Sequence, residues 1–131
     1  VAGFTVPLGA TINMDGTALY VGIVSVFAAQ AFGVDLSLTD YAIVAGSTTL
    51  VSIGTAAVPG ASLFLMAAVM GAIGITPEQI AIVIGFILPF DRPLDMLRTV
   101  VNICGDLSVA TAVANWEGEF ERDIFDRQTK Y

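Results

Sequence analysis

Residues 52–60 read SIGTAAVPG and lie inside a run of 37 residues, between Asp40 and Glu78, that contains no charged residue. As one helix this run would be roughly 55 Å long, whereas the hydrocarbon core of a membrane is about 30 Å thick. Small, hydroxylated and helix-breaking residues in the middle of the run predict an interruption. We expect two short helices, about residues 41–51 and 61–75, joined as a re-entrant hairpin; a tight turn between two full crossings is the alternative.

The composition of the whole chain also points to a membrane. Of the 131 residues, 56% are hydrophobic and only 13% are charged, whereas soluble domains have about 25% charged residues. This argues against a soluble enzyme domain and excludes a disordered chain. The net charge of -7 argues against a nucleic-acid partner, and the single cysteine cannot form an internal disulfide.

The first apolar stretch, residues 1–34, contains a comparable interruption at residues 7–17, PLGATINMDGT. An uncompensated aspartate at the bilayer centre costs about 2.5–3.5 kcal/mol, so Asp15 needs a partner or an ion. We expect an interrupted helix here, and a loop outside the membrane is the alternative. Two interrupted apolar segments in one chain are typical of a secondary transporter's binding site.

After the hairpin, Thr76, Pro77 and Gln79 are typical of a helix start. The pattern predicts one last helix over residues 77–115, and a bend is allowed at Pro93. Five of its polar residues fall within an arc of roughly 80°, with Thr99 at the border. They are Asp91, Asp95, Arg98, Asn102 and Asp106. Three acids against one arginine favour cation binding over the alternative, an internal ladder of salt bridges.

Residues 116–131 are rich in charge and predict a solvated tail. Trp116 suits the membrane–water boundary, and the bases of the tail, Lys130 among them, place the C-terminus in the cytoplasm. The connections at residues 35–40 and 76–79 contain no Lys or Arg and suit the outer side. Because the chain starts inside an apolar stretch without an initiator methionine, we expect a piece of a longer, multi-pass protein of the plasma or inner membrane.

Three segments, PLGATINMDGT, SIGTAAVPGA and LDMLRTVVNICGD, resemble the C-terminal part of the glutamate/aspartate transporters in the dicarboxylate/amino acid:cation symporter family. The resemblance runs from about Phe4 to Ala114. It implies an all-α membrane protein: an interrupted helix (1–34), a re-entrant hairpin (41–75) and a last transmembrane helix (77–115). Residues 1–115 would then be the C-terminal part of a transport domain, and residues 116–131 a cytoplasmic tail. The family resemblance also implies a homotrimer, formed through regions outside this chain.

The resemblance also implies substrate contacts. Asp95 would bind the α-ammonium group of the substrate, Asn102 the α-carboxylate and Arg98 the side-chain carboxylate. Three further residues, Thr17, Val58 and Thr99, would lie beside them. A planar guanidinium can bind a carboxylate through two parallel hydrogen bonds, so Arg98 favours aspartate or glutamate as substrate.

For sodium, the resemblance implies three sites of oxygen ligands, as a small hard cation requires. One uses the backbone carbonyls of Gly9, Asn13 and Asn102 with the Asp106 carboxylate. A second, formed when the hairpin closes, uses carbonyls of Thr11, Ser52, Ile53 and Thr55. A third uses the side chains of Asn13 and Asp15. Met14 would couple these sites to the substrate pocket, so that sodium and substrate favour each other's binding.

The hairpin departs from the commonest family pattern at Ala57 and Ser62, where glycines are frequent. Ser62 could add a hydrogen bond at the mouth of the pocket. The sequence thus favours sodium-coupled symport of acidic amino acids by alternating access. A proton-coupled acidic amino acid or C4-dicarboxylate symporter is the alternative within the same class. An intramembrane aspartyl protease, which needs two aspartates sharing a proton, and a purely structural bundle are remoter hypotheses.

Overall fold

The computed structural model describes residues 1–55 and 58–128, and every regular element in those ranges is helical. The helices are α1 (Ala2–Ile12), α2 (Asp15–Ala31), α3 (Leu38–Ile53), α4 (Ala61–Ala72), α5 (Pro77–Ile87), a short 3-10 helix η1 (Leu88–Phe90), α6 (Asp91–Trp116) and α7 (Arg122–Gln128). The all-α prediction is confirmed. Ala57 and Lys130, to which the sequence drew attention, lie outside the described residues.

Two of the helices begin with complete capping boxes, which fix where the chain turns back. At α5, the Thr76 hydroxyl accepts a hydrogen bond from the Gln79 backbone, and the Gln79 side chain accepts one from the Thr76 N–H. Ser37 and Asp40 form the same arrangement at the start of α3. Each box satisfies backbone donors that a helix start leaves free. The predicted helix start at Thr76 is therefore confirmed.

The α-helical geometry is interrupted between α1 and α2, between α3 and α4, and, by the 3-10 helix η1, between α5 and α6. The first two interruptions fall inside the predicted segments, at residues 13–14 and at the described residues 54, 55 and 58–60. The third differs from the prediction of one helix over residues 77–115 with a bend at Pro93. The helix instead breaks at η1, where Pro89 lacks an N–H and its ring clashes with the preceding turn. Pro93 lies in the first turn of α6, where a missing N–H is tolerated.

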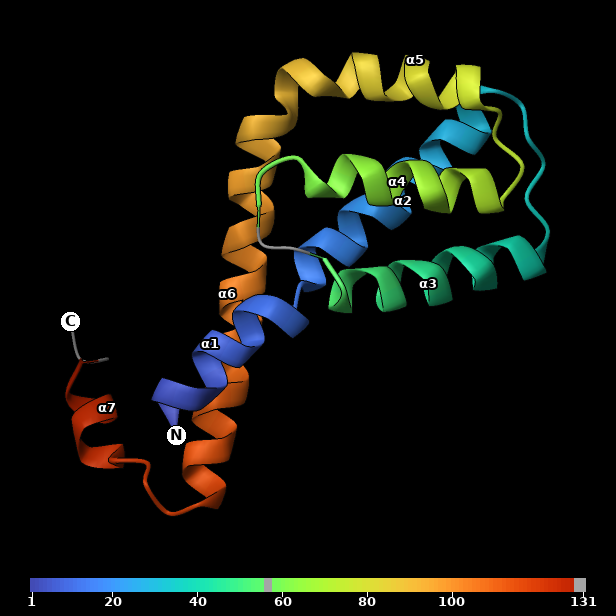
Figure 1. The fold of residues 1–131 in the computed structure, drawn as a ribbon. Helices are drawn as coiled ribbons and strands as arrows, with labels where there is room; N and C mark the ends of the chain where they lie inside the picture. Colours follow the sequence, from blue (N-terminus) through green and yellow to red (C-terminus); the bar gives the residue numbers. More distant parts are fainter. Residues whose placement is uncertain (56–57, 129–131) are drawn as a thin grey trace.

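The core lies where α2, α4 and their neighbours α3 and α5 pack together. Its largest fully buried apolar side chains are Val21 on α2 and Met66, Val69 and Met70 on α4. In Figure 1, α2, α3 and α4 run beside one another, and the α3–α4 connection approaches α6. α6 runs across their ends and also packs against α1. This arrangement brings the α1–α2 and α3–α4 interruptions to the same side of α6.

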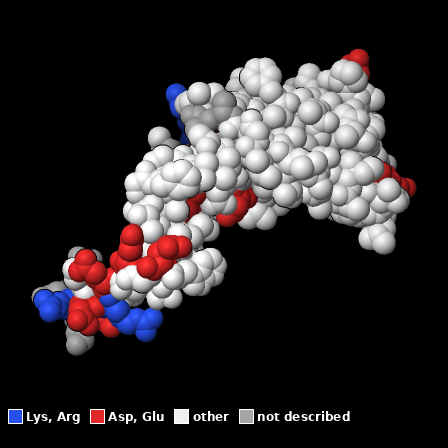
Figure 2. Space-filling view, turned by 60° about the horizontal axis from the view of Figure 1, so that its bottom comes forward, with Lys and Arg blue, Asp and Glu red and all other residues white. Residues whose placement is uncertain are grey.

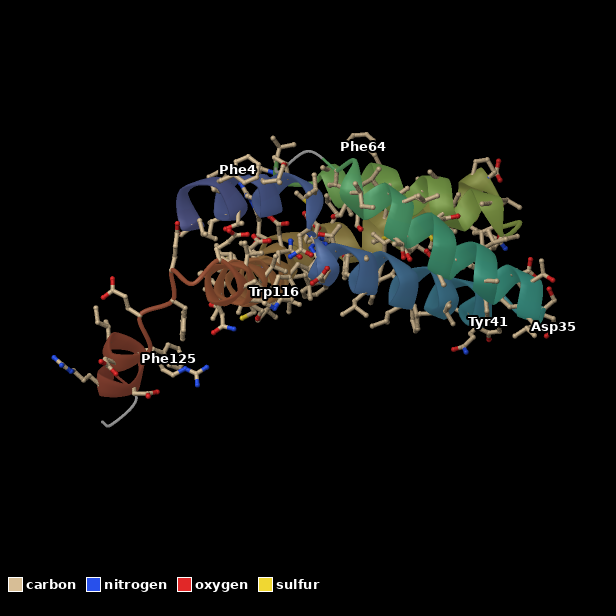
Figure 3. The ribbon with its side chains drawn as sticks, turned by 90° about the horizontal axis from the view of Figure 1, so that it is seen from below. Phe4, Asp35, Tyr41, Phe64, Trp116 and Phe125 are labelled. Atoms are coloured by element: carbon tan, nitrogen blue, oxygen red, sulfur yellow. The ribbon has the colours of Figure 1, made fainter. Side chains whose placement is uncertain are left out.

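The outer surface is strongly apolar. Leu38 is 87% exposed and Phe64 is 81% exposed, and Figure 3 shows Phe4 and Phe64 pointing away from the helices. Charged side chains gather instead on the tail that contains α7, as Figure 2 shows. By length and composition, the described stretch Ala2–Ala31 could cross a membrane, whereas α3 and α4 are apolar but shorter. Large exposed apolar surfaces mark contact with lipid or with further protein.

Candidate functional site

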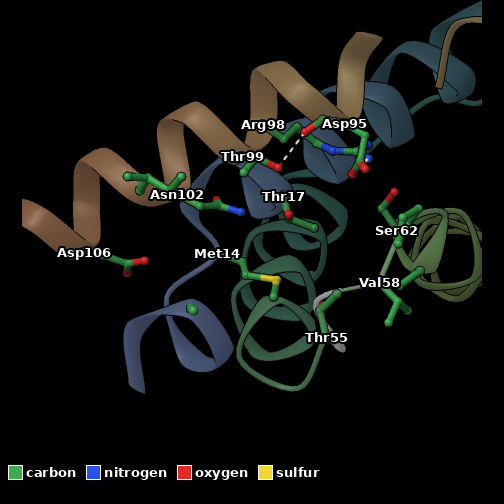
Figure 4. Close-up of a pocket in the computed structure, with 14 residues that line it drawn as sticks. Met14, Thr17, Thr55, Val58, Ser62, Asp95, Arg98, Thr99, Asn102 and Asp106 are labelled. Carbon is green, nitrogen blue, oxygen red and sulfur yellow. Dashed lines mark hydrogen bonds and ion pairs between the residues drawn. The ribbon is translucent and has the colours of Figure 1, made fainter. Parts of the chain in front are cut away.

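A cavity of about 400 Å³ lies between α6, the start of α2 and the α3–α4 connection. Its lining combines charged and hydroxyl-bearing side chains with small apolar ones, and Figure 4 shows them facing one another. The lining residues are Ala10, Met14, Thr17, Thr55, Val58, Pro59, Ala61, Ser62, Asp95, Arg98, Thr99, Asn102, Ile103 and Asp106. Such a concave space with a few convergent polar groups is typical of a small-molecule site.

Polar side chains of α6 form hydrogen bonds with the interruption between α1 and α2. Asn13 and Met14 both have non-helical backbone angles, so the first amides of α2 lack partners within a helix. The Gly16 N–H donates to Asn102 Oδ1 at 2.8 Å, and Asn13 Nδ2 donates to Asp106 Oδ1 at 2.8 Å. Side chains of α6 thus bind this junction through one backbone amide and one side-chain amide.

Three glycines allow this close approach between the junction and α6. A Cβ on Gly16 would lie 2.6 Å from the Arg98 carbonyl oxygen, and one on Gly9 would overlap with the Asp106 carboxylate. On α6 itself, a Cβ on Gly105 would lie 2.7 Å from both Asn13 Nδ2 and Asp15 Oδ2. The absence of these side chains lets Asn13 and Asp15 approach α6 at Gly105 and lets the Asp106 carboxylate approach α1 at Gly9.

Arg98 is the most constrained charged group of the cavity. Its side chain is only 6% exposed, and Nη2 lies 2.6 Å from Asp95 Oδ1 and 3.6 Å from Asp91 Oδ1. The guanidinium also lies over the Tyr20 ring, 4.2 Å from its centroid, a favourable cation–π geometry. Nε and Nη1 are buried and have no hydrogen-bond partner among the described residues. Two donor nitrogens of a buried cation are therefore available to an anion.

The structure brings the predicted substrate residues together. All six line the cavity: Thr17, Val58, Asp95, Arg98, Thr99 and Asn102. They come from α2, from the α3–α4 connection and from α6, which are distant in sequence. The spacing on α6 could predict only the shared face of four of them.

The structure does not place all predicted cation ligands in the cavity. Thr55, Asn102 and Asp106 line the cavity, whereas Gly9, Asn13 and Asp15 lie behind it against Asp106 and Gly105. Three others, Thr11, Ser52 and Ile53, lie outside the lining, near the ends of α1 and α3. Within the described residues, no group of three or more His, Cys, Asp or Glu side chains could hold a metal ion. A cation here would need amide and backbone carbonyl oxygens as well.

Sequence reasoning missed some residues of the site. Tyr20 was not singled out, although it follows Thr17 by one helical turn, the spacing that could have identified it. Four apolar residues of the lining could not be identified from the sequence, because nothing distinguishes them from other apolar residues: Ala10, Pro59, Ala61 and Ile103. Ser62, noted as a departure from the commonest pattern, is buried in the lining.

Comparison with known proteins gives consistent results. The profile of the sodium:dicarboxylate symporter family matches residues 1–116. The chain is 39% identical over 120 residues to a proton/sodium-glutamate symport protein of Bacillus subtilis, covering 92% of this chain and 27% of that protein. It is 38% identical over 122 residues to a proton/glutamate-aspartate symporter of Escherichia coli, covering 93% and 27%. It is 45% identical over 103 residues to the mouse excitatory amino acid transporter 3, covering 79% and 19%. The chain spans about a quarter of the length of these relatives, or less.

Proposed function

Since the chain belongs to the sodium:dicarboxylate symporter family, we propose that it forms the substrate- and cation-binding part of a sodium-coupled symporter for acidic amino acids. The family consists of membrane transporters rather than enzymes, so the protease hypothesis is wrong. The names of the relatives support glutamate or aspartate as the substrate, because each of the three is described as a carrier of acidic or excitatory amino acids.

The observation that carries this proposal is the Arg98–Asp95 pair in the wall of the cavity. The two side chains neutralise each other at 2.6 Å while two Arg98 nitrogens stay unpartnered. An acidic amino acid carries an ammonium group and a side-chain carboxylate. It can exchange this one internal pair for two new ones, ammonium to Asp95 and carboxylate to Arg98. A plain dicarboxylate leaves Asp95 without a cationic partner.

We assign the remaining substrate contacts to other residues that line the cavity. Asn102 binds the α-carboxylate, while Thr17, Thr99 and Val58 close the cavity around the substrate. The position of Asn102 supports its role: its Oδ1 accepts from Gly16 N–H, and its amide nitrogen has no partner among the described residues and can donate to the substrate.

We assign the sodium sites to the oxygen atoms around and behind the cavity. Asp106, with the carbonyls of Gly9, Asn13 and Asn102, forms one site, and the side chains of Asn13 and Asp15 contribute to another. Carbonyls of Thr11, Ser52, Ile53 and Thr55 form a third site when the α3–α4 connection closes. The close packing of Gly9 and Gly105 against these side chains supports the first two assignments.

The membrane arrangement follows from the same assignment. α1 and α2 form an interrupted transmembrane helix within residues 1–34, α3 and α4 a re-entrant hairpin within 41–75, and α5 and α6 the last transmembrane segment within 77–115. Residues 1–115 belong to a transport domain that moves by alternating access in a homotrimer of the plasma or inner membrane. The charged tail from residue 116 lies in the cytoplasm.

Uptake by the intact protein in proteoliposomes tests the function. Arg98→Ala should abolish sodium-driven aspartate uptake, because the substrate carboxylate loses its charged partner. The matched control is Arg92→Ala, which removes an exposed arginine six residues earlier and should transport normally. Full acidic amino acid uptake by Arg98→Ala would refute the proposal.

A proton-coupled symporter of acidic amino acids or C4-dicarboxylates is the second candidate. The Escherichia coli relative, described as a proton/glutamate-aspartate symporter, favours it. Replacing external sodium by choline separates the two: sodium coupling predicts loss of uptake, whereas uptake that persists and follows an imposed pH gradient supports the proton.

A further inference from the structure

The Ser62 hydroxyl is an unexplained group in the cavity wall. Ser62 is the second residue of α4 and is only 4% exposed, yet its Oγ has no hydrogen-bond partner among the described residues. Four other buried hydroxyls, those of Ser25, Thr48, Ser52 and Thr55, each donate to a backbone carbonyl three or four residues earlier in the sequence. An orphaned buried hydroxyl costs free energy, so its retention needs a reason.

Ser62 lies in the first turn of α4, so the carbonyl four residues earlier belongs to a residue outside the helix. In a helix, a serine hydroxyl usually donates to the carbonyl four residues earlier. For Ser62 that residue is Val58, which precedes α4 and whose carbonyl accepts from Ala61 N–H. The Ser62 hydroxyl does not donate to this carbonyl, and it has no other partner among the described residues.

Across the cavity, the hydroxyl faces the side chains proposed to bind substrate. Figure 4 shows Ser62 pointing toward Asp95 and Arg98 from the opposite wall. Arg98 Nε and Nη1 and the Ser62 hydroxyl are all buried donors without acceptors. A carboxylate has about four lone-pair positions and can accept from a guanidinium and a hydroxyl together.

We propose that Ser62 Oγ donates a hydrogen bond to the side-chain carboxylate of the substrate, on the side opposite Arg98, and so helps to select acidic amino acids. The inference rests on the proposed function. It gives α4 a direct contact with the group that distinguishes aspartate from neutral amino acids. α4 and α6 are then bridged by the substrate's acidic group.

Calorimetric titration of the intact protein with L-aspartate in sodium tests this role. Ser62→Ala should bind aspartate about tenfold more weakly, the range expected for losing a hydrogen bond to a charged group. The matched control, Ser25→Ala, also removes a buried serine hydroxyl, but one that donates to Val21 within α2, so it should bind normally. Ser62→Cys keeps nearly the same side-chain volume but replaces the hydroxyl by a weak hydrogen-bond donor. It should lose affinity for aspartate as Ser62→Ala does, which separates the effect of hydrogen bonding from that of packing. It also tests the proposal if Ser62→Ala does not fold.

Asparagine provides the second arm of the test, because it replaces the side-chain carboxylate by a neutral amide. Ser62→Ala should lose more affinity for aspartate than for asparagine. Wild-type affinity in Ser62→Ala or Ser62→Cys, or equal losses for both ligands, would overturn the role of Ser62. Failure of the proposed function is distinct: the unsubstituted protein would then show no sodium-dependent aspartate binding.

Discussion

The two interruptions that face α6 differ in how they are held. The α1–α2 junction spans residues 13–14, and α6 side chains bind it through two hydrogen bonds of 2.8 Å. In the α3–α4 connection, hydrogen bonds of the described residues 54, 55 and 58–60 join close neighbours in sequence, and Val58 is 59% exposed. The first interruption is therefore bonded to α6, whereas the described part of the second lines the cavity and makes hydrogen bonds to close neighbours in sequence. This difference suits a site that closes over a substrate.

The largest expected effect comes from filling the space at the α1–α2 junction. Gly16→Ala places a Cβ against the Arg98 carbonyl and Cα, which are backbone atoms and cannot rotate away. We expect a loss of about 3 kcal/mol of stability, the upper range for overpacking, together with loss of aspartate binding. Thermal unfolding in detergent measures the stability. Gly46→Ala is the control, because its Cβ would meet no atom within 4 Å; equal behaviour of the two variants would contradict the account of the junction.

A smaller effect should follow from neutralising the side chain that closes the junction. Asp106→Asn keeps the shape but weakens the hydrogen bond from Asn13, so we expect a loss of about 1–2 kcal/mol. Apparent sodium affinity should fall at least tenfold, measured by sodium titration of aspartate binding. The control is Asp123→Asn, which neutralises an exposed aspartate in the tail and should leave the sodium affinity unchanged. Unchanged sodium dependence in Asp106→Asn would favour a structural role for this carboxylate.

At the α3–α4 connection, the fold should tolerate change better. Gly60 has a φ of 80° at the start of α4, so Gly60→Ala introduces strain of about 1 kcal/mol. We expect a small shift in unfolding temperature and a clear reduction of uptake rate. A stability loss as large as that of Gly16→Ala would remove the distinction between the two interruptions.

The smallest effect is expected far from both interruptions, at the start of α3. Hydrogen bonds from the Ser37 hydroxyl and backbone lower the pKa of the Asp40 carboxyl. Its contribution to stability is thus present above the ordinary aspartate pKa and is lost as the pH falls through the lowered value. Acid titration of hydrogen exchange at the start of α3 should show this loss in the unsubstituted protein. Asp40→Asn should remove that pH dependence, and an identical profile would refute the capping role.

The parts of the fold that sequence could predict are those set by local chemistry. The break between α3 and α4, the helix start at Thr76 and the common face of Asp95, Arg98 and Asn102 depend on turn residues, capping and helical periodicity. The bend at Pro89 was missed because two prolines compete within five residues, and only their position in the helix decides which one breaks it. Tyr20 was missed because an aromatic residue in an apolar helix is usually part of the core, and only tertiary packing places it under Arg98.

Calorimetric titration of the intact protein with L-aspartate, in sodium and in choline, tests the central claim most directly. The account predicts saturable binding in sodium, its loss in choline, and its loss in Arg98→Ala even when sodium is present. Equal affinity in sodium and choline would contradict sodium coupling, and wild-type affinity in Arg98→Ala would contradict the role of the buried guanidinium.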